Sequence, residues 1–232
     1  MADEFDVQIK IGNSMLKKCF FLFFSLFLFA HTAEAGTIED HILSGNKFVQ
    51  DKKYQEAIRE YETVIKIDPQ NPEANLLLGL TLANTGDLDR AVKYSTTAVQ
   101  LKPTYAGYYN LGLIYANQGK YDLAVEAYEK ASEINPKSYQ TWYQLGLVYA
   151  QSLKFDKAIE AYNKVIELNP KFASAYQGLG GAYFWLGETE SAYAQVAKLK
   201  ELKLTGKAEE LERWIKDKES KKKKSAEKAA TK

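Results

Sequence analysis

Side chains suited to nucleophilic, acid–base or zinc chemistry are scarce in this sequence. It contains one cysteine, Cys19, and two histidines, His31 and His41. A structural zinc site needs about four ligands at defined spacing, and a cysteine nucleophile needs a histidine beside it. His41 stands where later, similar segments carry an aromatic residue, so we interpret it as part of a helix face. The sequence therefore predicts no catalytic residue, no metal site and no enzymatic activity.

One glycine-rich string resembles a phosphate-binding loop only in part. It runs Gly178-Leu179-Gly180-Gly181, and Tyr183 replaces the third glycine of the dinucleotide-binding pattern. Such a loop also has to follow a strand and open a helix, which the surrounding residues do not indicate. The carboxylates are spread over polar stretches, without an isolated pair suited to acid–base catalysis. We therefore predict no cofactor and no small-molecule substrate.

An apolar run near the N-terminus has the pattern of an export signal. Met15 and two lysines precede the uncharged residues Cys19–Ala30, and Ala33-Glu-Ala35 follows. A cationic start, a short apolar centre and small residues at the end are typical of a signal peptide, which we expect to span 15–35 and to be cleaved near Ala35. A helix that crosses a bilayer needs about 20 apolar residues. We therefore expect a periplasmic or secreted protein; the alternatives are a membrane anchor through Cys19–Ala30 or a buried core helix.

Residues 1–14 do not suit the short cationic start of such a signal, because they are polar and carry both charges. We interpret them as a tag or a mis-assigned upstream extension, with Met15 as the true start. Cys19 precedes most of the apolar run, whereas a lipidated cysteine follows it, so we do not expect a lipid anchor. After cleavage the chain has no cysteine, which suits an oxidising compartment.

A period of 33 or 34 residues organises the rest of the chain. Five glycines recur at spacings of 34, 33, 34 and 34: Gly45, Gly79, Gly112, Gly146 and Gly180. Each period holds two stretches with apolar residues at helical spacing, such as Trp142, Leu145 and Tyr149. A single pair of amphipathic helices cannot bury its apolar face, so neighbouring pairs must stack.

The best-formed period has an aromatic residue, Leu-Gly, tyrosine, alanine, a second aromatic residue and proline in a fixed order. Over residues 139–172 these are Trp142, Leu145, Gly146, Tyr149, Ala158, Tyr162 and Pro170. This pattern resembles the tetratricopeptide repeat family. Residues 105–138 repeat it with Tyr108, Leu111, Gly112, Tyr115, Ala124, Tyr128 and Pro136. The units 38–71, 72–104 and 173–206 depart from it at Ser44, Ser95, Val196 and Leu204.

The resemblance implies an all-α fold, a right-handed α-solenoid of about five helix pairs over residues 38–206. Degenerate terminal units are expected at the ends of such an array. The amphipathic segment 207–218 is predicted to be a capping helix, with Leu211, Trp214 and Ile215 covering the exposed end.

The C-terminal residues carry the basic charge of the chain. Residues 216–232 contain eight lysines and three acids. Because residues 219–232 are poor in apolar side chains, we predict a disordered tail. The run Lys221–Lys224 either serves solubility alone or contacts an anionic membrane surface or nucleic acid.

In tetratricopeptide proteins the first helix of each unit lines a concave groove, and the resemblance implies which positions point inward. The thirteenth position of each unit reads Gln50, Asn84, Asn117, Gln151 and Trp185, and the fifth reads Ile42, Leu76, Tyr109, Tyr143 and Gln177. The four amides could pair with the backbone of an extended peptide, because each has a donor and an acceptor. The candidate aromatic anchors are Tyr109, Tyr143, Phe184 and Trp185. The alternatives are that the amides only solvate the groove and that the aromatic rings pack between units.

These features predict a non-catalytic scaffold or adaptor that binds a protein or extended peptide in its groove, in the cell envelope or outside the cell. A structural self-assembling module and a regulatory subunit of an envelope enzyme complex are the rival hypotheses. One subgroup of the family holds the C-termini of cytosolic chaperones with lysines and an asparagine. Asn46 matches one such position, but Ile42 stands where a lysine belongs, so we do not expect that partner.

Overall fold

The computed structural model describes residues 37–230, with side chains described for residues 37–227. The predicted signal segment 15–35 and residues 1–14 lie outside the described residues. Every regular element in the described part is a helix. A helix over residues 37–50 precedes the others, which are α2 (Tyr54–Ile67), α3 (Pro72–Thr85), α4 (Leu88–Leu101), α5 (Tyr105–Asn117), α6 (Tyr121–Ile134), α7 (Tyr139–Gln151), α8 (Phe155–Leu168), α9 (Ala173–Leu186), α10 (Thr189–Glu201) and α11 (Thr205–Ala230).

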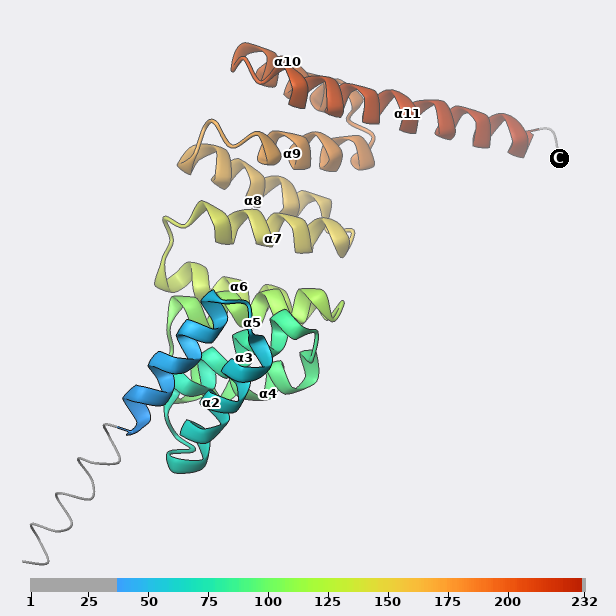
Figure 1. The fold of residues 1–232 in the computed structure, drawn as a ribbon. Coiled ribbons are helices and arrows are strands. Elements are labelled where there is room, and N and C mark those ends of the chain that lie inside the picture. Colours follow the sequence, from blue (N-terminus) through green and yellow to red (C-terminus); the bar gives the residue numbers. More distant parts are fainter. Residues whose placement is uncertain (1–36, 231–232) are drawn as a thin grey trace, which may run out of the picture.

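The helices form a stack of pairs, which confirms the predicted all-α solenoid (Figure 1). From α2 onward, each helix packs against the next one along the chain, and some first helices of neighbouring pairs also touch, such as α3 with α5 and α7 with α9. Each predicted unit contains one pair of helices. Within residues 37–230, no helix has both the length and the apolar character that a membrane crossing requires.

Prolines end the second helix of each of the first four pairs. Helices α2, α4, α6 and α8 stop at caps that directly precede a proline, namely Asp68, Lys102, Asn135 and Asn169. A residue before proline is driven out of the helical region by a clash with the proline ring. The four caps accordingly have φ between −144° and −132° and ψ between 81° and 98°. The recurring proline thus turns the chain into the next unit.

Polar caps begin most of the first helices. The side chains of Asn71, Thr104 and Ser138 accept a backbone N–H three residues later, at the starts of α3, α5 and α7. Asp87 caps a second helix, α4, in the same way. Asp122 instead lies inside α6, and its carboxylate pairs with Lys154 of the next unit at 2.8 Å.

A tyrosine of the second helix fills the space beside the repeat glycine of the first. Tyr61, Tyr128 and Tyr162 are fully buried, with 0%, 0% and 1% of their surface exposed. They lie against Gly45, Gly112 and Gly146, where an added Cβ would be 2.4 to 2.6 Å from a ring carbon. In the second unit Ser95 replaces the tyrosine, and α3 and α4 approach directly, so that a Cβ on Gly79 would be 3.0 Å from the backbone nitrogen of Ser95.

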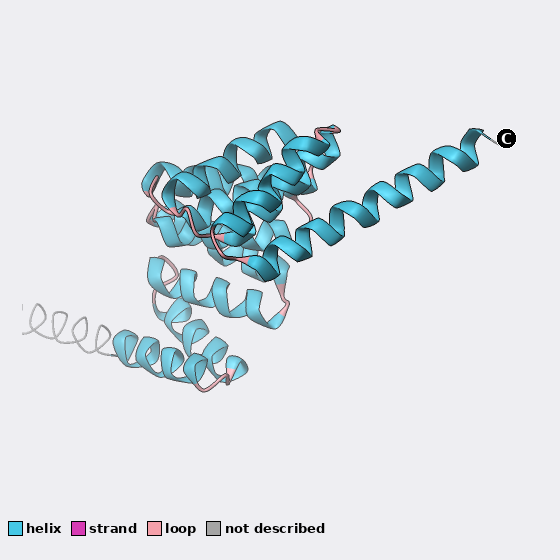
Figure 2. Cartoon of the chain, turned by 90° about the horizontal axis from the view of Figure 1, so that it is seen from above, coloured by secondary structure: helices cyan, strands magenta, loops and turns pink. Residues whose placement is uncertain are grey.

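Helix α11 packs against the last pair and continues well beyond residue 218. Leu211 and Ile215 are 4% and 0% exposed, within the cluster formed by α9 and α10. The prediction of a disordered tail over residues 219–232 is wrong for residues 219–230, which extend α11 away from the stack (Figures 1 and 2). Alanine, lysine and glutamate favour helix strongly, and Lys221 pairs with Asp217 one turn earlier at 2.8 Å. Local helix propensity therefore compensates for the missing apolar face.

Candidate functional site

Residues that could carry out catalysis do not converge in the described part of the chain. Within residues 37–230 there is no group of three or more His, Cys, Asp or Glu side chains arranged to hold a metal ion. His41 is half-buried, and its Nδ1 lies 2.5 Å from Oε2 of Glu60 in α2, so it joins the first two helices. The largest pKa shifts belong to tyrosines, because burial disfavours their phenolate form. Burial is the main cause that raises the pKa of Tyr61 to about 12. These groups are parts of the packing.

The four predicted amides occupy the same place in four successive units. Each lies at the C-terminal end of a first helix: Gln50, Asn84, Asn117 and Gln151. All four residues are exposed. Their side chains make no hydrogen bond to any residue among 37–227 that the structure records, in contrast to Gln118 and Gln177, whose amides are bonded. The row of amides thus retains its donors and acceptors for a ligand.

The two predicted tyrosines already have partners inside the solenoid. Tyr109 is half-buried, and its ring centroid lies 5.7 Å from those of Tyr105 and Tyr128. Tyr143 is also half-buried and lies 6.0 Å from Tyr162 and 5.0 Å from Phe172. These separations are typical of favourable aromatic pairs. Both rings therefore contribute to packing between helices. Each remains partly exposed, on a helix that also carries one of the amides.

The last two candidate anchors, Phe184 and Trp185, differ in exposure. Phe184 is 6% exposed and belongs to the core between α9 and α11, with its ring 5.4 Å from that of Trp214. Its prediction as a surface anchor is wrong, because α11 packs over the position that an open groove would expose. Trp185 remains 55% exposed and stacks on Phe155 with ring centroids 6.4 Å apart.

Helix α11 also covers other inward positions of α9. The Gln177 amide donates to the carboxylate of Glu210 at 3.1 Å and to the carbonyl of Lys207 at 3.4 Å. A Cβ on Gly181 would lie 3.9 Å from the Trp214 ring. The last unit is therefore partly occupied by the chain itself. The open candidate surface consists of the first helices of the four earlier units, which we call the first-helix surface: residues 37–50, α3, α5 and α7.

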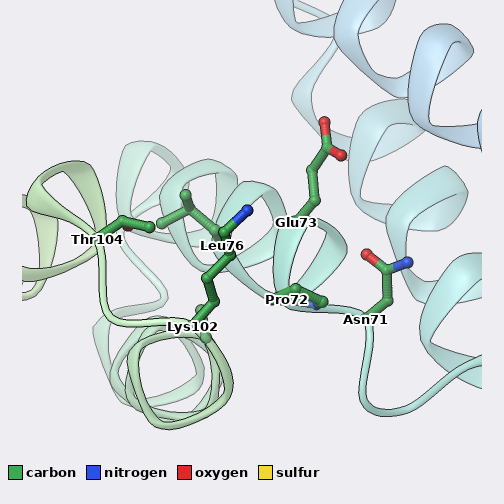
Figure 3. A pocket seen from close by; sticks show the side chains of 7 residues that line it. Asn71, Pro72, Glu73, Leu76, Lys102 and Thr104 are labelled. Atoms are coloured by element: carbon green, nitrogen blue, oxygen red, sulfur yellow. The ribbon is translucent and has the colours of Figure 1, made fainter.

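A cavity of about 320 Å³ opens beside this surface at α3 (Figure 3). It is lined by Asn71, Pro72, Glu73, Leu76, Ala98, Lys102 and Thr104. Figure 3 shows Leu76 between Thr104 on one side and the start of α3 on the other. The sequence marks Leu76 as an inward position, but the cavity depends on residues of two helices and the turn between α4 and α5. A comparison of the units position by position could have revealed this cavity from the sequence.

Sequence profiles of known families match the repeated part of the chain. A profile described as "Tetratricopeptide repeat" matches residues 105–138 and 139–172, and another of the same description matches 72–105. A profile described as "TPR repeat" matches residues 45–86. Together these segments span more than half of the chain.

Curated relatives match in a limited region. The Hsp70-Hsp90 organising protein of Plasmodium falciparum is 32% identical over 101 residues, which are 40% of this chain and 18% of that protein. Small glutamine-rich tetratricopeptide repeat-containing protein 2 of Saccharomyces cerevisiae is 35% identical over 97 residues, which are 41% of this chain and 28% of that protein. The match therefore spans less than a third of the length of either relative.

Solved structures match over most of their length. A crystal structure of MamA is 33% identical, covers 72% of this chain and 92% of its own, and has a TM-score of 0.70. YrrB, described as a TPR protein with an unusual peptide-binding site, is 19% identical and shares the fold with a TM-score of 0.68. Since the repeat read from the residues folds into stacked helix pairs and is matched by family profiles and by a structure at 33% identity, the chain belongs to the tetratricopeptide repeat family.

Proposed function

We propose that this chain is a non-catalytic scaffold or adaptor that binds a partner protein through an extended segment laid along the first-helix surface. The observation that carries the proposal is the row of amides at Gln50, Asn84, Asn117 and Gln151, which are exposed, in register and without a hydrogen-bond partner recorded within residues 37–227. A side-chain amide can donate to a peptide carbonyl and accept from a peptide N–H at once. A row of such groups fits a ligand whose own backbone groups are unpaired.

The partner differs in kind from the chaperones named in the curated relatives. Those relatives are Hsp70-Hsp90 organising proteins, and their similarity to this chain is limited to 101 and 97 residues. In this chain the side-chain Oδ1 of Asn46 accepts a hydrogen bond from the Tyr61 hydroxyl at 2.8 Å, which joins the first two helices. Ile42 occupies the position where the chaperone-binding subgroup carries a lysine. A negatively charged C-terminus would therefore meet the apolar side chain of Ile42 instead of a cation.

We further propose that the scaffold works in the cell envelope or outside the cell. The support is the cationic start, the apolar run Cys19–Ala30 and the small residues that end at Ala35. N-terminal sequencing of the protein purified from its native compartment tests this part. A chain that begins at Gly36 agrees with export and cleavage, whereas a chain that retains residues 15–35 contradicts cleavage.

The binding surface is tested by removing two neighbouring amides. Asn117→Ala combined with Gln151→Ala is expected to reduce recovery of the native partners at least about fivefold in quantitative co-purification, because several hydrogen bonds are lost at once. Asn163→Ala is the matched control, since Asn163 is an exposed amide on the second helix α8. Equal recovery of every partner by the double variant and by the control contradicts binding at the first-helix surface.

A further inference from the structure

The cavity beside α3 lies where the next two units carry aromatic rings. Three positions surround this place in each unit: the first and fifth residues of the first helix, and the residue that caps the first helix of the next unit. In the unit 139–172 all three are aromatic. Phe172 lies 5.2 Å from Tyr139 and 5.0 Å from Tyr143 between ring centroids, so the three rings pack together and fill the space.

The preceding unit fills the same place with two rings and hydrogen bonds. Tyr105 and Tyr109 stack with their centroids 5.7 Å apart. The third position is Ser138, whose hydroxyl lies 2.9 Å from the Tyr105 hydroxyl, and Thr141 donates to the same oxygens. Ser138 is 6% exposed and Thr141 is 0% exposed. This place is therefore closed in the unit 105–138 as well.

The unit 72–104 has no ring at any of the three positions. They are Pro72, Leu76 and Thr104, and all three line the cavity of about 320 Å³ (Figure 3). The turn is also one residue shorter, since one residue separates Lys102 from Thr104 while two separate Asn135 from Ser138. The cavity is thus the space that rings occupy in the next two units.

We propose that this cavity binds an aromatic side chain of the partner, which supplies the ring that the unit 72–104 lacks. The inference rests on the proposed function and adds an aromatic residue to the chemistry of the partner segment. A cavity of about 150 Å³ is large enough to take up benzene, so this cavity has room for a phenyl or phenol ring. Leu76, Pro72 and Ala98 supply the apolar wall.

Of the two charged side chains that line the cavity, the ammonium of Lys102 is complementary to the face of such a ring. Lys102 lines the cavity and has no ion pair with any residue among 37–227 that the structure records. An ammonium group is attracted to the face of an aromatic ring. The molecule makes the same pairing elsewhere, with the Lys130 ammonium 5.4 Å from the Tyr108 ring and that of Lys157 5.5 Å from the Tyr149 ring.

The cavity lies on the same helix as one amide of the row, Asn84. Leu76 and Asn84 are eight positions apart in α3, which corresponds to roughly 12 Å along the helix axis. An extended peptide covers that distance with about four residues. A partner segment can therefore place a ring in the cavity and its backbone at Asn84 simultaneously.

The test is a titration of the full chain, labelled with nitrogen-15, with N-acetyl-phenylalaninamide, and with N-acetyl-alaninamide as the control without a ring. We expect saturable NMR shifts at the amides of Glu73, Leu76 and Thr104, with a dissociation constant on the order of 1 mM. The alanine probe is expected to give none. Shifts that do not saturate, or that lie away from these residues, overturn the proposal.

Filling the cavity from within gives the decisive variants. Leu76→Tyr restores the residue found at Tyr109 and Tyr143, and it is expected to weaken phenylalaninamide binding at least about tenfold. Leu43→Tyr, at an exposed leucine of the helix over residues 37–50, is the matched control and should bind as the parent chain does. Thr104→Phe, the residue found at Phe172, is the second filling variant if Leu76→Tyr fails to fold. Undiminished binding by a folded filling variant overturns the proposal.

These outcomes are separable from those of the amide variants. The probe is not a partner protein, so its binding at Leu76 does not depend on the surface formed by Asn117 and Gln151. If the probe binds saturably and the amide variant recovers every partner, the proposed function is contradicted and the aromatic site is not. Loss of partners from the amide variant without probe binding contradicts the aromatic site alone.

Discussion

Gly146 lies directly against the ring of Tyr162, and a Cβ at this glycine would be 2.5 Å from the ring carbon Cε1. Tyr162 is fully buried between α7, α8 and α9, so its ring cannot move away without displacing other buried side chains. The repeat glycine therefore serves the close approach of a ring, and backbone freedom is not the reason for it. Gly112 has the same relationship to Tyr128 in the preceding unit.

Replacing Gly146 by alanine is expected to destabilise the protein by about 1–2 kcal/mol. Overpacking costs about 1–3 kcal/mol, and the higher helix propensity of alanine offsets up to about 1 kcal/mol of it. Urea unfolding followed by circular dichroism measures the difference. Gly206→Ala is the control, because a Cβ at Gly206 near the start of α11 meets nothing within 4 Å. A Gly146→Ala protein as stable as this control would contradict the steric role.

The hydroxyl groups of two equivalent tyrosines are predicted to differ in their contribution to stability. The Tyr61 hydroxyl donates to Asn46 at 2.8 Å, whereas the buried Tyr128 hydroxyl has no hydrogen-bond partner within the described residues. Tyr61→Phe should therefore cost about 1 kcal/mol, while Tyr128→Phe should be neutral or stabilising by up to about 1 kcal/mol. The two variants are controls for each other in a denaturant titration. A larger loss for Tyr128→Phe would mean that its hydroxyl is satisfied by bound water.

Stability is predicted to fall in alkaline solution. Burial, and then the Glu73 carboxylate, raise the pKa of Tyr61 to about 12 from an ordinary value of 10.0, and burial also raises the pKa of Tyr128 and Tyr162. Since the folded state holds these protons more tightly than the unfolded state, their stabilisation is complete below about pH 10 and is lost as the pH rises through the folded-state values.

The midpoint temperature should therefore stay nearly constant between about pH 7 and 9 and decrease above about pH 10. Phenolate absorbance recorded during the same titration should show a late fraction of tyrosines that ionises together with unfolding. In Tyr61→Phe the decrease should be shallower. If all the tyrosines ionise near pH 10 while the helix signal persists, the proposed coupling between burial and stability is incorrect.

The helix pairs could be predicted from the sequence, because the residues that define them are close together in the chain and recur in successive units. Apolar spacing predicts the helix pairs, and a proline after the second helix of each of the first four pairs predicts where the pair ends, because proline constrains the residue before it regardless of tertiary context. Asn117 and Gln151 end two of these helices, and their position on the inner face was implied by the resemblance to the tetratricopeptide repeat family.

The candidate site was less predictable where it depends on non-repeated parts. Burial of Phe184 follows from the position of α11, which the period of the units does not specify. The helix beyond Lys218 follows from propensity and from pairs such as Lys221 with Asp217, which the low apolar content of the segment obscures. The cavity at Leu76 follows from the absence of rings at three positions in one unit, and no single residue signals it.

The two halves of α11 are predicted to contribute very unequally to stability. Ile215 is 0% exposed in the cluster that closes the last pair, so Ile215→Ala should cost about 2–4 kcal/mol through lost burial and the cavity left behind. Residues 221–227 are all exposed, and this end of α11 extends away from the stack (Figure 1), so deletion of residues 222–232 should change the free energy of unfolding by less than about 0.5 kcal/mol. Thermal unfolding of the two proteins and the parent chain measures both effects. A large loss on deletion would show that the distal half of α11 stabilises the solenoid, and a negligible loss in Ile215→Ala would show that the array does not require its capping helix.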